Sequence, residues 1–287
     1  MSEPSLFVQR FGNPGPDGTL LFLHATGLNG SCYRPLLERL DFDGEIILPS
    51  MRGHGRTSLP ANPQTLLSWH PLAADILDWI SREELAGPLT LGGHSSGAIT
   101  SLLVSTKVPT ERVLMIEPVV LPRPVVWLAN SPFRKTVMNR IPIAQQAAAR
   151  RDSFASREKA WEFWRPKKFF RNWEEAAFAG YVAEGLEEMD GGVRLSCTPQ
   201  FESAMFKAQA HGFWPHLAES IRTTKGVSIL AAQDQTTFPL KRRPRAAKMG
   251  ARVTEFEGGH MLPLEQPEET VQWLENEIRG KDKLTRV

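Results

Sequence analysis

Short apolar runs that alternate with amphipathic stretches constrain the fold of this chain more than any other feature of the sequence. The runs are rich in Leu, Ile and Val and occupy residues 20–24, 45–49, 88–94, 112–118, 227–234 and 252–260. Between the second and third runs, apolar side chains recur at helical spacing, at Leu72, Ile76, Trp79 and Ile80. Strands that alternate with helices favour parallel pairing. The pattern therefore predicts an α/β fold with a mostly parallel, twisted sheet flanked by helices.

This alternation stops between residues 122 and 215. The segment contains 15 of the 25 aromatic residues and has no run rich in Val and Ile. Stretches such as 156–165 and 172–189 have the spacing of amphipathic helices. We therefore predict a core formed by residues 1–121 and 216–287, with residues 122–215 inserted as a helical lid.

Basic residues are concentrated in the first half of the inserted segment. Residues 122–171 contain 12 Lys or Arg against three Asp or Glu. A solvated basic face is the simpler interpretation, and recognition of an anionic ligand or a membrane surface is the alternative.

Composition excludes several classes of protein. Lys and Arg number 34 and Asp and Glu number 32, and this net charge of +2 is too small for nucleic-acid binding that depends on phosphate attraction. Two cysteines are too few for a disulfide framework or a cysteine-based zinc site. The N-terminus lacks a secretory signal, and no window reaches the roughly 18 apolar residues of a membrane span. The sequence thus predicts a cytoplasmic protein without stable membrane insertion.

The most specific local motif is Gly93-His94-Ser95-Ser96-Gly97, which lies between an apolar run and a helical stretch. In that context Gly-x-Ser-x-Gly predicts a nucleophile elbow, where the chain turns sharply from a strand into a helix and exposes the serine. We expect Ser95 to be a nucleophile at the carboxyl edge of the sheet.

A serine nucleophile needs a base, and the base needs a carboxylate that orients it. His260 is the best of the seven histidines, because its loop follows the last predicted strand. Asp234 follows the run 227–234 and is the favoured acid. Glu117 follows the strand after the elbow and is the rival acid.

Two backbone N–H groups are expected to hold the oxyanion that forms when Ser95 attacks a carbonyl. Ser96 provides one by its place after Ser95. Thr26, in the loop after the first strong strand, is favoured for the other, with Ala25 as the alternative. The side chains expected to line a substrate pocket are Leu28, Val119, Trp127, Phe238 and Met261.

Together these motifs resemble the serine-hydrolase branch of the α/β-hydrolase superfamily. PSMRGHGRTSLP is similar to the family's Arg-Gly-His-Gly loop, AAQDQTTFP to its acid loop, and GGHMLPLEQPEETVQWL to its histidine loop and final helix. The order Ser, Asp, His along the chain is also that of the family. The resemblance covers residues 19–121 and 225–278, and Ala25 departs from it where glycine is usual.

The resemblance implies acyl transfer in two steps through an acyl-enzyme, with no metal and no organic cofactor. The leading expectation is hydrolysis of a carboxylic ester of a small to medium, partly apolar molecule. A lactonase, a thioesterase or acyltransferase, a carbon–carbon bond hydrolase and an aminopeptidase would share these motifs. A ligand receptor without turnover is the alternative from another class.

Overall fold

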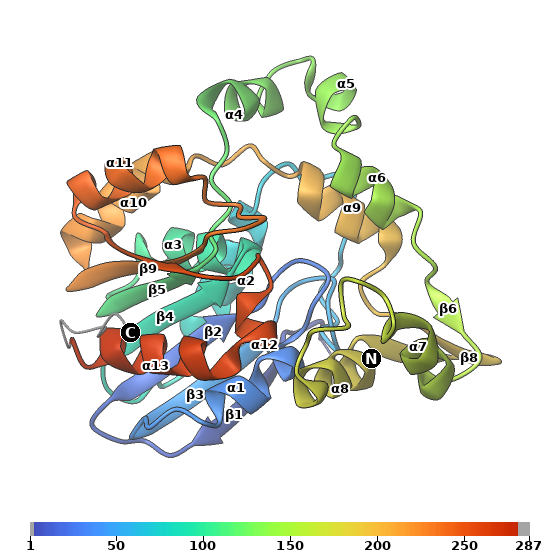
Figure 1. The fold of residues 1–287 in the computed structure, drawn as a ribbon, viewed down its shortest axis with the longest axis horizontal. Helices are drawn as coiled ribbons and strands as arrows, with labels where there is room; N and C mark the ends of the chain where they lie inside the picture. Colours follow the sequence, from blue (N-terminus) through green and yellow to red (C-terminus); the bar gives the residue numbers. More distant parts are fainter. Residues whose placement is uncertain (1–2, 281–287) are drawn as a thin grey trace.

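The computed structural model describes residues 3–280 and contains a seven-stranded sheet in the order β1-β3-β2-β4-β5-β9-β10 (Figure 1). These strands are β1 (Phe7–Gly12), β2 (Gly18–Leu23), β3 (Gly44–Ser50), β4 (Leu89–His94), β5 (Arg112–Ile116), β9 (Gly226–Ala232) and β10 (Arg252–Phe256). Every neighbouring pair is parallel except β1 and β3, where Phe7 is opposite Ser50. The predicted fold class, a mostly parallel sheet flanked by helices, is confirmed. The antiparallel edge strand β1 had no apolar run to predict it, because its side chains are only partly buried.

Helices cover both faces of this sheet (Figure 1). On one face are α2 (His70–Ile80), α3 (Ser96–Ser105), α10 (Phe213–Thr223) and α11 (Arg243–Met249), and on the other are α1 (Arg34–Leu37) and α13 (Pro267–Ile278). Alternate side chains of β2 point to opposite faces, so Leu21 and Leu23 join one hydrophobic cluster while Leu20 and Phe22 join the other. The short helices η1 (Gly30–Cys32), η2 (Leu240–Arg242) and α12 (Leu262–Glu265) lie in connecting loops.

The chain between β5 and β9 adds no strand to the main sheet. We call residues 122–215 of it the insertion; its elements are α4 (Arg123–Ala129), α5 (Arg134–Met138), α6 (Pro142–Ala148), β6 (Ser153–Phe154), α7 (Arg157–Trp164), α8 (Glu175–Glu184), β7 (Leu186–Met189), β8 (Gly192–Leu195) and α9 (Pro199–Lys207). A helical segment was predicted here, and the structure has helices along most of it together with three short strands that the sequence did not predict. Strands β6, β8 and β7 form a small antiparallel sheet, but they are too short and too charged to show a strand pattern. The predicted boundary between residues 215 and 216 falls inside α10.

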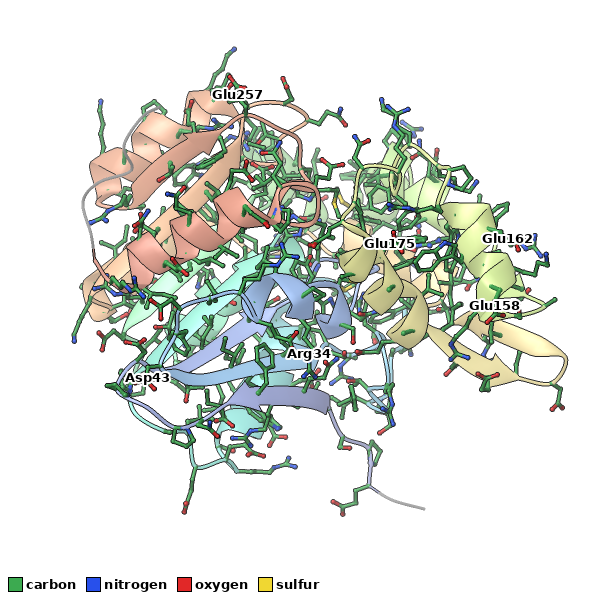
Figure 2. The ribbon with its side chains drawn as sticks, turned by 60° about the horizontal axis from the view of Figure 1, so that its bottom comes forward. Arg34, Asp43, Glu158, Glu162, Glu175 and Glu257 are labelled. Carbon is green, nitrogen blue, oxygen red and sulfur yellow. The ribbon has the colours of Figure 1, made fainter. Side chains whose placement is uncertain are left out.

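The insertion packs closely on the core through α8. A Cβ atom at Gly180 would lie 2.2 Å from the carbonyl oxygen of Ser31, so only glycine allows this approach. On the far side, Glu158 and Glu162 of α7 point away from the main sheet (Figure 2). Helices α4 and α5 project beyond one end of the sheet (Figure 1).

Within residues 3–280, no helix has the length and apolar character that crossing a membrane would require. The same residues contain no group of three or more His, Cys, Asp or Glu side chains placed to hold a metal ion.

Candidate active site

Ser95 lies at the tight turn between β4 and α3. Its backbone has φ 56° and ψ −113°, a strained conformation that costs on the order of 1–3 kcal/mol. The flanking glycines allow the turn, because a Cβ at Gly93 would lie 2.5 Å from Gly97 and a Cβ at Gly97 would lie 2.1 Å from the Leu23 carbonyl oxygen. The Ser95 N–H donates to the Ile116 carbonyl across the sheet at 2.9 Å. These contacts hold the serine at the carboxyl edge of the sheet.

His260 lies between Ser95 and a buried carboxylate. Its Nε2 atom is 3.0 Å from Ser95 Oγ, and its Nδ1 atom is 3.1 Å from Glu117 Oε2. Because a carboxylate only accepts hydrogen bonds, Nδ1 carries the proton of the neutral ring. Nε2 is then free to accept the serine hydroxyl. This order of donors and acceptors suits general-base activation of Ser95.

The Glu117 carboxylate is held in place by hydrogen bonds, most of them from the end of β9 and the loop that follows it. The side chain is fully buried, and the backbone φ of 47° turns it away from the strand direction. Four donors reach its carboxylate oxygens: Ala232 N at 2.7 Å, Thr236 Oγ1 at 2.8 Å, Thr237 N at 2.9 Å and His260 Nδ1 at 3.1 Å. A buried carboxylate with this many donors has a single orientation.

Asp234 does not occupy that place. Its side chain is exposed, and its backbone N–H donates to the Gly258 carbonyl at 2.9 Å. Within residues 3–280, no hydrogen bond or ion pair joins Asp234 to His260. The prediction that Asp234 is the carboxylate partner of His260 is therefore wrong, and the rival residue Glu117 has this position. The left-handed backbone at Gln235, with φ 44°, lies where the chain passes from exposed Asp234 to Thr236 and Thr237, which bind Glu117.

The loop after β2 distinguishes the two candidates for the second oxyanion donor. The Ala25 N–H donates to Tyr33 Oη at 3.2 Å, Gly27 N–H to His54 Nε2 at 3.0 Å, and Leu28 N–H to the Ala25 carbonyl at 3.1 Å. Neither Thr26 N–H nor Ser96 N–H has a hydrogen-bond acceptor within residues 3–280. The Thr26 hydroxyl also donates to Ser96 Oγ at 3.0 Å, so the two residues are adjacent. Thr26 and Ser96 thus retain free donors, whereas the donor of Ala25 is occupied.

A buried hydrogen-bond chain connects this loop to the histidine loop. Tyr33 Oη accepts the Ala25 N–H and donates to His94 Nδ1 at 2.7 Å. His94 Nε2–H then donates to the His260 carbonyl at 2.8 Å. Burial lowers the pKa of His94 well below its usual value, with a smaller contribution from His260, and burial raises the pKa of Tyr33. Both side chains are therefore neutral at pH 7. No sequence motif marks Tyr33, and sequence analysis missed it.

The five residues expected to line a substrate pocket fall into two groups. Val119 and Trp127 belong to a pocket of about 600 Å³ between α4, α10 and α11. Leu28, Phe238 and Met261 are instead packed in the hydrophobic clusters, with exposed fractions of 3%, 0% and 9%. The first residue along the chain that lines the pocket is Val119, two positions after Glu117. Neither Ser95 nor His260 is among the described residues that line it.

Comparison with known proteins gives matches over most of the chain. The sequence model described as "Alpha/beta hydrolase family" matches residues 20–273. The magnesium-chelatase 30 kDa subunit of Rhodobacter capsulatus is 24% identical over 262 residues, which are 87% of this chain and 82% of that protein.

Two solved structures resemble the fold closely. E-2-(acetamidomethylene)succinate hydrolase has a TM-score of 0.72 and 19% identity, with 96% of this chain and 95% of that chain covered. A thioesterase domain from the curacin biosynthetic pathway has a TM-score of 0.71 and 16% identity, with 97% and 99% covered. At these identities the structural likeness concerns the fold alone.

Proposed function

The chain belongs to the α/β-hydrolase family, and from that premise we propose that it is a serine hydrolase that cleaves a carboxylic ester or related acyl bond of a small, partly apolar molecule. The observation that carries the proposal is the continuous contact from Ser95 Oγ through His260 to Glu117, with distances of 3.0 and 3.1 Å. We also propose that the insertion acts as a lid over this site. A receptor without turnover would not need three side chains aligned in this order.

In the first step, Ser95 Oγ attacks the substrate carbonyl carbon while His260 Nε2 accepts the hydroxyl proton. The Glu117 carboxylate stabilises the imidazolium that forms. The oxygen of the tetrahedral intermediate accepts hydrogen bonds from Thr26 N–H and Ser96 N–H, and the N-terminal end of α3 adds its positive dipole. His260 then protonates the leaving group, and an acyl-enzyme on Ser95 remains.

In the second step, water takes the place of the leaving group. His260 removes a proton from the water as it attacks the acyl carbon, and the same two N–H groups hold the oxyanion. Collapse of the intermediate releases the acid and returns the proton to Ser95. Esters, lactones and thioesters would all pass through these steps, so the leaving group has to be identified by experiment.

The test is the initial rate on para-nitrophenyl esters from acetate to palmitate, measured for the wild type and for Ser95→Ala. We expect the wild type to hydrolyse the shorter esters and Ser95→Ala to lose roughly a million-fold in kcat. Hydrolysis retained by Ser95→Ala would place the chemistry elsewhere. A folded wild type that hydrolyses no ester, thioester or lactone but binds such compounds tightly would favour the receptor.

A further inference from the structure

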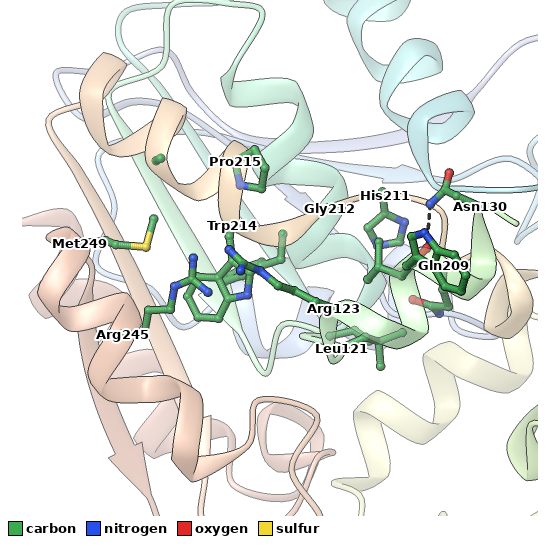
Figure 3. Close-up of a pocket in the computed structure, with 15 residues that line it drawn as sticks. Leu121, Arg123, Asn130, Gln209, His211, Gly212, Trp214, Pro215, Arg245 and Met249 are labelled. Carbon is green, nitrogen blue, oxygen red and sulfur yellow. Dashed lines mark hydrogen bonds between the residues drawn. The ribbon is translucent and has the colours of Figure 1, made fainter.

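The pocket between α4, α10 and α11 has features that the proposed acyl transfer does not use (Figure 3). Its volume is about 600 Å³, which suits a small organic ligand. Apolar and aromatic side chains form much of its wall, among them Leu121, Val126, Trp127 and Trp214. Trp127 is 67% exposed although it is one of the largest apolar side chains of the chain. A ligand in the pocket would cover this exposed surface.

Two guanidinium groups meet in this pocket from different elements. Arg123 begins α4 and Arg245 lies on α11, and both point toward the Trp214 ring (Figure 3). The Arg245 guanidinium carbon is 4.1 Å from the centre of that ring. The described residues that line the pocket include no Asp or Glu, and within residues 3–280 neither arginine forms an ion pair. The pocket therefore has two positive charges without a counter-charge from the described residues.

A buried polar atom in the same pocket has no hydrogen-bond partner among the described residues. His211 lines the pocket with an exposed fraction of 5%, and its Nδ1 atom makes no hydrogen bond with any described residue. The neighbouring amide nitrogens donate elsewhere: Gln209 Nε2 donates to the Phe206 carbonyl at 3.1 Å and Asn130 Nδ2 to the Val126 carbonyl at 2.8 Å. An unpaired buried polar atom costs stability unless a ligand satisfies it.

We propose that this pocket binds an amphipathic organic carboxylate. The carboxylate lies between Arg123 and Arg245, whose planar guanidinium groups match two oxygens. The apolar part lies against Leu121, Trp127 and Trp214, and His211 Nδ1 meets a polar group of the ligand. Val119 lines the pocket and lies two residues after Glu117, so the pocket is close in the chain to the proposed catalytic carboxylate. The bound carboxylate can therefore belong to a substrate that extends to Ser95 or to a separate effector.

Isothermal titration calorimetry with octanoate and with 1-octanol tests the proposal without any turnover. The two compounds share chain length and differ in charge. We expect octanoate to bind the wild type at least tenfold more tightly than octanol. The double variant Arg123→Gln/Arg245→Gln should lose that preference and keep its affinity for octanol, whereas Trp127→Ala should weaken both ligands.

Arg222→Gln is the matched control, because Arg222 lies on α10 outside the pocket and pairs with Glu219. It should bind octanoate as the wild type does. Equal affinity of the wild type for octanoate and octanol would overturn the proposal, as would a preference that survives in the double variant. Binding to phosphatidylglycerol vesicles without binding to free octanoate would also overturn it and indicate a membrane surface.

A second measurement separates substrate from effector. Octanoate that competes with a para-nitrophenyl ester for the wild type indicates a substrate site, and octanoate that changes kcat without competing indicates an effector site. If no ester, thioester or lactone is turned over, the proposed hydrolase function fails, while the calorimetric result still decides the carboxylate site.

Discussion

The carboxyl edge of the main sheet and the insertion use their side chains in different ways. At the sheet edge, Ser95, His260 and Glu117 are each held by several hydrogen bonds from different strands and loops. In the insertion, Phe178 and Tyr181 of α8 are packed in an aromatic core with exposed fractions of 0% and 1%. By contrast, Phe133 beside α5 is 66% exposed. A substitution at the sheet edge should therefore change the rate of catalysis. A substitution in the insertion should change stability where the side chain is packed and ligand binding where it is exposed.

Among the variants that compare the two regions, the largest effect is expected at the edge, for Glu117→Gln. Loss of the carboxylate removes the group that orients His260 and stabilises its charged form, so kcat should fall by about a thousand- to ten-thousand-fold. Asp234→Asn is the matched control and should keep kcat within about a factor of three, because its side chain is exposed. Rates on one para-nitrophenyl ester suffice. If Asp234→Asn lost most of its kcat while Glu117→Gln stayed active, Asp234 and not Glu117 would be the carboxylate partner of His260.

Two phenylalanines test the difference between packed and exposed aromatic rings within the insertion. Phe178→Ala removes a fully buried ring that contacts Phe170 and Trp161, so it should lower the free energy of unfolding by about 3–5 kcal/mol. Phe133→Ala should change it by no more than about 0.5 kcal/mol. Urea unfolding followed by circular dichroism measures both. Similar losses in the two variants would show that α4 and α5 have a packed core of their own.

Buried histidines predict how stability depends on pH. Burial, with smaller contributions from His70 and His216, lowers the pKa of His211 to about 3. The unfolded state, where the pKa is about 6.5, therefore binds the proton first, and stability is lost as pH falls below 6.5. At pH 5 the loss for this group is about 2 kcal/mol. His211→Phe should remove that part of the pH dependence, and urea titrations at pH 7.5 and pH 5 should show it. Parallel pH dependence in variant and wild type would contradict the expectation.

The smallest effect concerns the hydrogen-bond chain through Tyr33. Tyr33→Phe leaves the Ala25 N–H and His94 Nδ1 without their partner while the ring stays in place. We expect kcat to fall about tenfold with little change in KM, because the oxyanion loop and the His260 loop lose a shared contact. A variant that loses stability but keeps kcat would indicate a purely structural role for Tyr33.

Local sequence patterns predicted the parts of the molecule that depend on neighbouring residues. The apolar runs located six of the seven strands of the main sheet, and Gly93 and Gly97 predicted the elbow, because a sharp turn needs small residues wherever it occurs. The short strands of the insertion were missed, because pairs such as Glu187 and Arg194 have no apolar alternation. The aromatic content of the insertion was evident, but its division into packed and exposed rings was not.

The sequence by itself determined the fold class, the strand that leads into Ser95 and the loop that bears His260, because each follows from periodicity or from residues adjacent in the chain. Only the tertiary structure decided which acid meets His260. Glu117 and Asp234 both follow strands that end at the same sheet edge, and the pairing of Ile116 with Leu230 places their two loops side by side. Which of the two acids points inward depends on the left-handed backbone at Glu117 and Gln235. It also depends on the hydrogen bonds that Thr236 and Thr237 donate to Glu117. These are long-range conditions, which no local pattern contains.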